Sequence, residues 1–239
     1  MEQKLKDKIA IVTGGSNGIG EAIAKKLNTL GAKVIVFDIQ KPKTGFEWYK
    51  VDITKDAVIK TAIEKIDKVD ILINNTGVYF EKYLEQTTDK DLDYMVDINI
   101  KGTFKITRNA IEKIKKQKGC IVNIASCLGL VPELTSPLYC TTKAGIIMLT
   151  KCLAQQYADI GVRVNCVLPG ATMTELLEKS FKNENDKKKC ADRIPMRKIG
   201  TPSDVANLVA FLVCDEASYI TGGVYTVDGG VSSSSIYSK

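Results

Sequence analysis

Short apolar runs rich in β-branched residues alternate with longer amphipathic stretches along this chain. The apolar runs cover residues 8–13, 33–37, 46–51, 69–73, 119–125, 161–168 and 224–227. Helical spacing marks the stretches that end at Gly31, that cover 55–67, that run up to Gly119, that cover 139–159 and that begin at Thr201. Continuous apolar strands are typical of a parallel sheet covered on both faces. The alternation therefore predicts right-handed βαβ units in one doubly wound α/β domain, with a seven-stranded, mostly parallel sheet and helices on both faces.

One segment departs from this alternation. Residues 173–196 are charged and poor in apolar side chains. Long connections inside compact domains are often lids, so we expect this one to close on substrate; a surface excursion that orders on binding is the alternative. The rest indicates a single domain over residues 1–239. For the tail, residues 232–239, a frayed end and docking near a neighbouring subunit's site both remain open.

Composition narrows the compartment and the partners. The chain is 44% apolar and 26% charged, as ordinary globular proteins are. It has no long apolar run and begins with the charged residues 1–8, so we expect neither a membrane span nor a signal peptide, and a cytoplasmic protein. The net charge of +6 is spread out. Its cluster at residues 112–118 suits a solvated helix end better than a nucleic-acid surface, and no nucleic-acid partner is expected.

Cysteine and histidine content limits the chemistry. Seven cysteines occur without a CxxC pair, and the chain has no histidine. We therefore expect reduced, mostly buried thiols and no metal site. Ser-His-Asp and Cys-His catalysis are excluded, so acid–base chemistry has to use Tyr, Lys, Asp, Glu or Cys.

A glycine-rich turn joins the first strand to the first helix. It reads Thr13-Gly14-Gly15-Ser16-Asn17-Gly18-Ile19-Gly20. Glycines let the backbone approach a pyrophosphate, and a helix N-terminus offers free N–H groups to the anion. Tight strand-to-helix turns also collect glycine for steric reasons alone.

Polar residues follow the other strand ends. Asp38 comes about 20 residues after the glycines, where a carboxylate binds an adenosine ribose and repels a 2′-phosphate. This favours NAD over NADP, although Lys41 and Lys43 lie nearby and a simple turn aspartate is the alternative. Asp52 and Asn75 follow the third and fourth strands. Ligands of such sheets bind beyond the carboxyl ends of the strands, so these positions together predict a dinucleotide site.

Tyr139 and Lys143 are one helical turn apart, and Ser126 follows the fifth strand. Positions i and i+4 share a helix face, which puts a phenol and an ammonium in one small volume. Their ordinary pKa values are about 10 and about 10.4, and a fixed cation favours the phenolate. We therefore expect the pKa of Tyr139 to be lowered, by roughly 3 units with help from an oxidised nicotinamide. An incidental Tyr and Lys on a surface helix is the alternative.

Five segments, in this order, resemble the signatures of the classical short-chain dehydrogenase/reductase family. They are the glycine turn 13–20, Asn74-Asn75-Thr76-Gly77 with Thr76 in place of the usual alanine, the YxxxK of 139–143, Pro169-Gly170 followed by Thr174, and 220–223 with 227–230. The resemblance covers the chain from Thr13 to Gly230. It implies a single Rossmann-type domain that binds NAD, or less favourably NADP.

The resemblance also implies roles for individual residues. It makes Tyr139 the catalytic acid–base, with Lys143 lowering its pKa, Ser126 orienting the substrate oxygen and Asn99 supporting a water chain to the lysine; Ser126 and Tyr139 bind substrate. A buried Asn99 needs partners, which a local helix bend around a water would supply. The implied cofactor-binding residues are Gly14, Ser16, Asn17, Gly18, Ile19, Gly20, Asp38, Asp52, Ile53, Asn75, Gly77, Tyr139, Lys143, Pro169, Gly170, Thr172 and Thr174.

The implied reaction is hydride transfer between the nicotinamide and a secondary alcohol, a ketone or a sugar (aldose or polyol). One alternative is an NADPH-dependent 3-oxoacyl-[acyl-carrier-protein] reductase, for which a basic residue would be expected where Asn17 or Ile39 stands. A second is a non-catalytic nucleotide-sensing protein. The resemblance suggests a homotetramer or homodimer acting on a small-molecule substrate.

Overall fold

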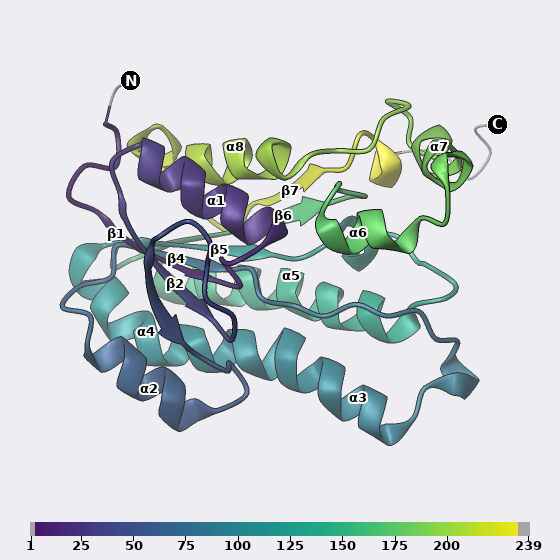
Figure 1. The fold of residues 1–239 in the computed structure, drawn as a ribbon. Coiled ribbons are helices and arrows are strands. Elements are labelled where there is room, and N and C mark those ends of the chain that lie inside the picture. Colours follow the sequence, from purple (N-terminus) through teal and green to yellow (C-terminus); the bar gives the residue numbers. More distant parts are fainter. Residues whose placement is uncertain (1–2, 234–239) are drawn as a thin grey trace.

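A seven-stranded sheet, parallel throughout, forms the middle layer of the molecule (Figure 1). The computed structural model describes residues 3–233, apart from the side chain of Leu176. The strands are β1 (Ile9–Thr13), β2 (Lys33–Asp38), β3 (Glu47–Lys50), β4 (Ile71–Asn74), β5 (Cys120–Ile124), β6 (Arg163–Pro169) and β7 (Val224–Val227), in the order β3-β2-β1-β4-β5-β6-β7. The predicted doubly wound sheet is thereby confirmed.

Helices cover both faces of the sheet. They are α1 (Gly18–Thr29), α2 (Asp56–Glu64), α3 (Asp89–Val96), α4 (Thr103–Gln117), α5 (Pro137–Tyr157), α6 (Glu175–Ser180), α7 (Glu184–Asp192) and α8 (Pro202–Val213). In Figure 1, α1 and α8 lie on one side of the sheet, and α2, α4 and α5 lie on the other.

The pleat of the strands divides the core between these two layers. Val12 packs in a cluster with residues of α1 and α8 such as Leu27 and Val209. Its neighbour Ile11 points the other way, into a cluster with residues of α2, α4 and α5. Successive side chains of a strand point to opposite faces, so a central strand that is apolar at every position needs cover on both sides.

Local sequence signals set several helix boundaries. Thr201 and Asp204 form a capping box at the start of α8, with Pro202 in the first turn, as the sequence predicts. Gly31 adopts the left-handed conformation just after α1, again as predicted. The charged segment 173–196 contains two helices, α6 and α7, and its closing on substrate stays a prediction.

Two findings bear on the remaining expectations. Within residues 3–233, no helix has both the length and the apolar character that crossing a bilayer requires. Residues 234–239, the main part of the predicted tail, lie outside the described residues.

Because all strands are parallel, their carboxyl ends meet at one edge of the sheet. Gly14, Asp38, Asn75 and Gly170 each stand at or directly after such an end, and Ser126 follows β5 by two residues. This edge positions the candidate site.

Candidate functional site

The glycine turn between β1 and α1 is shaped for close approach. Gly14 and Gly18 have φ values of +62° and +55°, which L side chains rarely adopt. A Cβ on Gly20 would lie 2.1 Å from the carbonyl oxygen of Gly14, so only glycine fits there. The side chain of Asn17 does not cap α1, which leaves the N–H groups of the first turn free for an anion. The turn therefore fits the pyrophosphate of a dinucleotide.

Asn75 braces this turn from the next strand. Its side-chain Nδ2 donates to the carbonyl oxygens of Thr13 and Gly14, each at 3.1 Å. The hydroxyl of Thr13 in turn accepts from the backbone N–H groups of Asn75, at 3.0 Å, and Thr76, at 3.1 Å. Thr13 was missed as a functional residue, although its position at the end of β1 could have indicated this role.

The carboxylate of Asp38 connects the end of β2 to the glycine turn. It accepts hydrogen bonds from the backbone N–H groups of Ser16, at 3.1 Å, and Gln40, at 2.9 Å. The Ser16 hydroxyl donates to the carbonyl of Gln40 at 2.7 Å, and the Asn17 amide donates to the Gln40 side chain at 3.1 Å. Asp38 is thus part of a built loop, beyond the simple turn aspartate that we weighed.

Two residues that follow β3, Asp52 and Ile53, have different surroundings. Asp52 accepts from the backbone N–H of Thr54 at 2.9 Å and from its hydroxyl at 2.7 Å. Ile53 is buried, and a Cβ on Gly102 would lie 2.5 Å from its Cδ1. The side chain of Ile53 therefore packs in the core, so only its main chain is free to contact a nucleotide, and that contact stays a prediction.

The segment after β6 lies across from the glycine turn. Gly170 passes so close to Asp228 that a Cβ would be 2.8 Å from the Asp228 Cα. Thr172 is buried, with its hydroxyl donating to the Gly170 carbonyl at 3.0 Å. Thr174 caps α6, and its Cγ2 lies 3.2 Å from where a Gly18 Cβ would stand. The base of the predicted lid therefore touches the phosphate turn, as a clamp on a dinucleotide needs. Ile19 packs partly buried against the core beneath the turn, and Pro169 ends β6.

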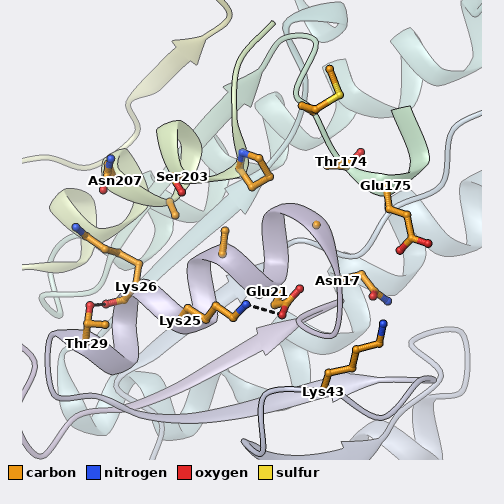
Figure 2. Close-up of a pocket in the computed structure, with 15 residues that line it drawn as sticks. Asn17, Glu21, Lys25, Lys26, Thr29, Lys43, Thr174, Glu175, Ser203 and Asn207 are labelled. Atoms are coloured by element: carbon orange, nitrogen blue, oxygen red, sulfur yellow. Dashed lines mark hydrogen bonds and ion pairs between the residues drawn. The ribbon is translucent and has the colours of Figure 1, made fainter. Parts of the chain in front are cut away.

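A groove of about 630 Å³ lies on the outer side of this contact. Figure 2 shows it between α1, α8 and the start of α6. Asn17, Gly18 and Thr174 form the wall that it shares with the phosphate turn. Lys25 lies along α1 and forms an ion pair with Glu21 at 2.7 Å. The groove is thus adjacent to the cofactor side of the site, and Tyr139 does not line it.

Tyr139, Lys143 and Ser126 come together at the end of β5. Lys143 is 5% exposed, and its Nζ donates to the carbonyl of Ile124 at 3.1 Å, which ties α5 to the strand. The same Nζ lies 5.6 Å from the centre of the Tyr139 ring. Ser126 is buried and in hydrogen-bonding contact with the Tyr139 hydroxyl. The surface-helix alternative is therefore wrong.

The ionisation of this pair differs from our expectation. Burial raises the pKa of Tyr139 to about 12, and the hydrogen bond with Ser126 opposes that rise only in part. Burial also lowers the pKa of Lys143 to about 8. The protein alone does not lower the tyrosine pKa, since loss of solvent outweighs a cation that sits beside the ring; the lowering that we expect with an oxidised nicotinamide stays a prediction.

Asn99 lies behind the lysine in η2 (Asp97–Gly102), a π-helical segment between α3 and α4. The side chain is 1% exposed, and both its oxygen and its nitrogen form hydrogen bonds. Its Oδ1 accepts from the backbone N–H of Val78 at 2.8 Å, and its Nδ2 donates to the Val78 carbonyl and to the Thr142 hydroxyl, both at 3.1 Å. The predicted bend is present, but protein groups supply the partners that we assigned to a water.

Gly77 and two residues that we missed complete the site. A Cβ on Gly77 would lie 3.2 Å from Lys143 Nζ and 3.3 Å from Asn99 Oδ1, so a larger residue would crowd both. Thr142 joins Asn99 to the catalytic helix, and its place inside the 139–143 motif was the available signal. Tyr79 packs against Tyr139, and only its position just after a strand end could have marked it.

The cysteines and acidic residues that the structure describes form neither a disulfide nor a metal site. All seven cysteines are free, four of them buried. Among residues 3–233, no group of three or more His, Cys, Asp or Glu side chains could hold a metal ion.

Comparisons with known proteins agree with this geometry. A family model described as enoyl-(acyl carrier protein) reductase matches residues 14–232. An uncharacterized oxidoreductase of Thermotoga maritima is 36% identical over 93% of this chain and 96% of its own. The 3-oxoacyl-[acyl-carrier-protein] reductase of Aquifex aeolicus is 37% identical, over 97% of this chain and 100% of its own. The ligand-free aldohexose dehydrogenase of Thermoplasma acidophilum superposes with a TM-score of 0.95, with 32% identity over 100% and 99% of the two chains.

Proposed function

The chain belongs to the classical short-chain dehydrogenase/reductase family and is an NAD(P)-dependent oxidoreductase, and from this premise we propose the reaction that it catalyses. The reaction is hydride transfer between NAD(H) and a secondary alcohol or ketone, with an aldose or polyol as the substrate. The observation that carries the proposal is the meeting of Ser126, Tyr139 and Lys143 at the sheet edge that also bears the glycine turn.

Proton transfer falls to Tyr139. In reduction its phenol, protonated at neutral pH because burial raises its pKa to about 12, donates the proton to the developing alkoxide. In oxidation the phenolate form of Tyr139 accepts the hydroxyl proton, and Lys143 with the positive charge of a bound oxidised nicotinamide would stabilise that form. When bound, the oxidised nicotinamide supplies positive charge and accepts the hydride. Ser126 orients the substrate oxygen by donating a hydrogen bond to it.

The cofactor is held along the strand ends. Residues of the glycine turn bind the pyrophosphate, Asp38 binds the adenosine ribose, and Pro169 to Thr174 position the nicotinamide, whose ribose Lys143 also contacts. Asp38 supports NAD over NADP, because its carboxylate repels a 2′-phosphate. Asn99 fixes the loop in front of Lys143 and supports a proton path to it.

Two observations support a sugar and a carrier-linked substrate, respectively. The likeness to an aldohexose dehydrogenase supports the sugar. The second candidate, a 3-oxoacyl-[acyl-carrier-protein] reductase, is supported by relatives such as that of Aquifex aeolicus. Asn17 and Ile39, where a basic residue would hold the phosphate of NADPH, favour the first.

The proposal extends to the whole molecule. Residues 1–239 act as one dinucleotide-binding and catalytic domain, with 173–196 closing on substrate as a lid. The enzyme is a cytoplasmic homotetramer or homodimer with no nucleic-acid or membrane partner. Exposed apolar side chains on α3, α4 and α5, among them Tyr94, Phe104 and Met148, support assembly through that face.

The test is a reduced-nicotinamide assay over aldoses, polyols, steroids and β-keto esters with both cofactors. We expect turnover of an aldose or polyol with NAD⁺. Selective reduction of β-keto esters with NADPH would favour the second candidate instead. No turnover with any pair, together with tight NAD binding, would favour the nucleotide-sensing alternative.

The same assay tests the catalytic assignment. Tyr139→Phe should lower kcat by about 10³-fold while NADH affinity, followed by fluorescence, stays nearly unchanged. The control is Tyr219→Phe, because Tyr219 is fully exposed. Wild-type turnover in Tyr139→Phe would refute the assignment.

A further inference from the structure

Tyr79, five residues after the end of β4, stands against the catalytic tyrosine. The two ring centres are 4.9 Å apart with an interplanar angle of 80°, so the rings meet edge to face. Aromatic pairs favour this arrangement, and it restricts rotation of both side chains. Tyr79 therefore limits where the Tyr139 hydroxyl can point.

A hydrogen-bonded chain holds Tyr79 in turn. The Ser136 hydroxyl donates to the Tyr79 oxygen at 3.3 Å, and the Tyr79 hydroxyl donates to the Glu81 carboxylate at 2.8 Å. Ser136 is 1% exposed and directly precedes the catalytic helix α5. The phenol thus links the loop after β4 to the start of the helix that carries Tyr139.

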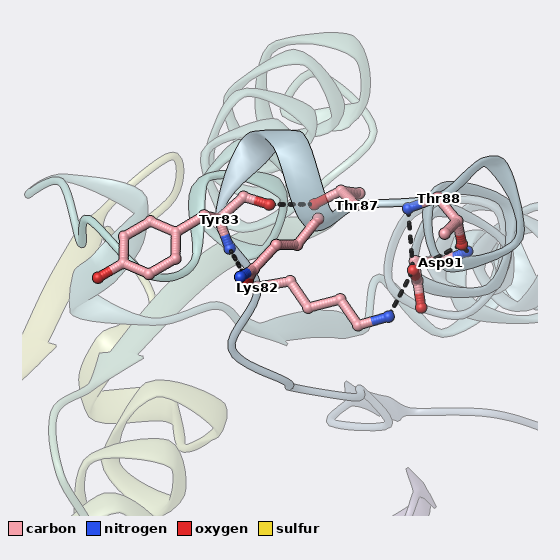
Figure 3. A network of polar contacts seen from close by, with 6 residues as sticks. Lys82, Tyr83, Thr87, Thr88 and Asp91 are labelled. Carbon is pink, nitrogen blue, oxygen red and sulfur yellow. Dashed lines mark hydrogen bonds and ion pairs between the residues drawn. The ribbon is translucent and has the colours of Figure 1, made fainter.

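The loop itself is anchored at both sides. The backbone N–H of Lys82 donates to the Thr135 carbonyl at 2.8 Å, just before α5. Figure 3 shows the Lys82 side chain reaching Asp91 at the start of α3. The two form an ion pair at 2.6 Å, and Asp91 also caps α3 together with Thr88. A residue on such a loop has a defined position from which to hold another side chain.

Tyr79 is unsuited to proton transfer itself. Tyr79 is 40% exposed, and its partial burial and the hydrogen bond to Glu81 raise its pKa above the ordinary tyrosine value, since ionisation would place two negative charges side by side. Its contribution to the reaction is then geometric.

We propose that Tyr79 is a positioning residue for catalysis, which holds the phenol of Tyr139 toward Ser126 and Lys143 and is itself held by Ser136 and Glu81. The proposal rests on the proposed function, in which Tyr139 transfers the proton. The ring of Tyr79 should account for most of the effect on kcat, because the ring contacts Tyr139 directly. The hydroxyl of Tyr79 should account for the smaller part.

Three variants separate these shares in the oxidation of D-glucose by NAD⁺, or of the panel substrate with the highest turnover. Tyr79→Leu, which removes the ring, should lower kcat about tenfold with KM for NAD⁺ unchanged. Tyr79→Phe, which keeps the ring, should restore most of that loss and remain about threefold below wild type. Tyr79→Phe with Ser136→Ala should lower kcat no further than Tyr79→Phe does, because both changes remove the same hydrogen bond.

A second measurement does not depend on turnover. The ultraviolet difference titration between each protein and its Tyr139→Phe counterpart reports the ionisation of Tyr139 alone. In Tyr79→Leu the ring of Tyr139 loses cover, so its phenol should ionise at a lower pH than in wild type.

The matched control is Tyr83→Phe. Tyr83 lies in the same loop, and its hydroxyl points away from the neighbouring side chains in Figure 3. It should leave kcat and the titration unchanged.

The outcomes distinguish this proposal from the one on which it rests. If Tyr139→Phe is inactive while Tyr79→Leu keeps kcat within about twofold and leaves the titration unchanged, the role of Tyr79 is refuted and the reaction stands. If Tyr139→Phe turns over like wild type, the proposed function fails first. A shifted titration would still support the contact between the two rings.

Discussion

The buried ammonium of Lys143 serves the proposed reaction but lowers the stability of the fold at neutral pH. Its ammonium is 5% exposed and donates a hydrogen bond to the Ile124 carbonyl at 3.1 Å. Burial without an acidic partner lowers its pKa from 10.5 to about 8. The folded state therefore binds this proton more weakly than the unfolded chain, and stability rises with pH between about 8 and 10.5.

Lys143→Met should abolish activity and stabilise the fold at pH 7. Removing the buried cation releases up to about 3 kcal/mol, and leaving the Ile124 carbonyl without its donor costs about 1–2 kcal/mol. The expected net gain is about 1–2 kcal/mol at pH 7, and it should largely disappear near pH 10, where the wild-type amine is neutral. Urea unfolding of both proteins at the two pH values measures this. A variant less stable than wild type at pH 7 would contradict the expected sign.

Asp38 is the residue on which cofactor choice depends. Asp38→Asn removes the charge and keeps an oxygen for the N–H of Ser16 or Gln40. The ratio of kcat/KM for NADP to that for NAD should rise at least about tenfold, because a carboxylate no longer faces the 2′-phosphate. Steady-state kinetics with both cofactors measures the ratio. Asp159→Asn, an exposed change after α5, is the control. An unchanged ratio would exclude Asp38 as the selective residue.

At the level of elements, the π-helical segment η2 lies between α3 and α4 and directs the side chain of Asn99 into the site. It turns Asn99 toward the loop after β4, while α3 and α4 continue on either side. A wider turn leaves backbone groups that need other partners, and such segments often occur at functional sites. Here the hydroxyl of Thr103 donates to the Asn99 carbonyl at 3.0 Å.

Asn99→Ala should affect both stability and turnover. It leaves both backbone groups of Val78 without their side-chain partner, at a cost of about 3 kcal/mol in unfolding free energy. It also frees the loop in front of Lys143, so kcat should fall by at least about tenfold. Asn109→Ala is the control. Asn109 lies on α4 away from the site, and its side chain donates hydrogen bonds to the Asp56 carboxylate of α2 and to the Lys105 carbonyl. That variant should lose stability and retain kcat; equal loss of kcat in both would indicate general destabilisation.

At the level of the whole molecule, α3, α4 and α5 lie on one side of the sheet (Figure 1). Apolar side chains on these helices remain exposed. Phe104 is 51% exposed on α4. Exposed apolar groups on neighbouring helices indicate a surface that another molecule covers. A second copy of this chain would bury them in a symmetric contact.

Phe104→Glu should therefore reduce the assembly state of the enzyme. A charge introduced into an apolar contact loses its solvent without gaining a partner, so the dimer or tetramer should dissociate. Size-exclusion chromatography with light scattering measures the mass. Val58→Glu, at an exposed apolar position on α2, should leave it unchanged. A wild-type protein that is monomeric throughout would contradict the proposed assembly.

Much of the site could be predicted because its parts belong to local patterns. Gly14, Gly18 and Gly20 follow an apolar strand, and the structure shows the positive φ angles and the close approach that require glycine. Tyr139 and Lys143 are one turn apart on a helix, so their proximity follows from helix geometry. The shared edge of the strand ends followed from parallel βαβ connections, whereas the order of the strands came from the structure.

The contacts of Tyr79 with Tyr139 and of Asn99 with Val78 and Thr142 join segments that are distant in the chain, and no local periodicity encodes them.

The amino-acid sequence by itself determined the layers, the edge at which strands end and the residues offered there, because periodicity and turn chemistry act over a few neighbouring positions. Only the tertiary structure decided how those groups ionise and what holds them. Burial, which depends on segments far apart in the chain, raises the pKa of Tyr139 to about 12 and lowers that of Lys143 to about 8. The pKa of a buried group depends on the solvent, charges and hydrogen bonds around it, and these surroundings exist only once the chain has folded.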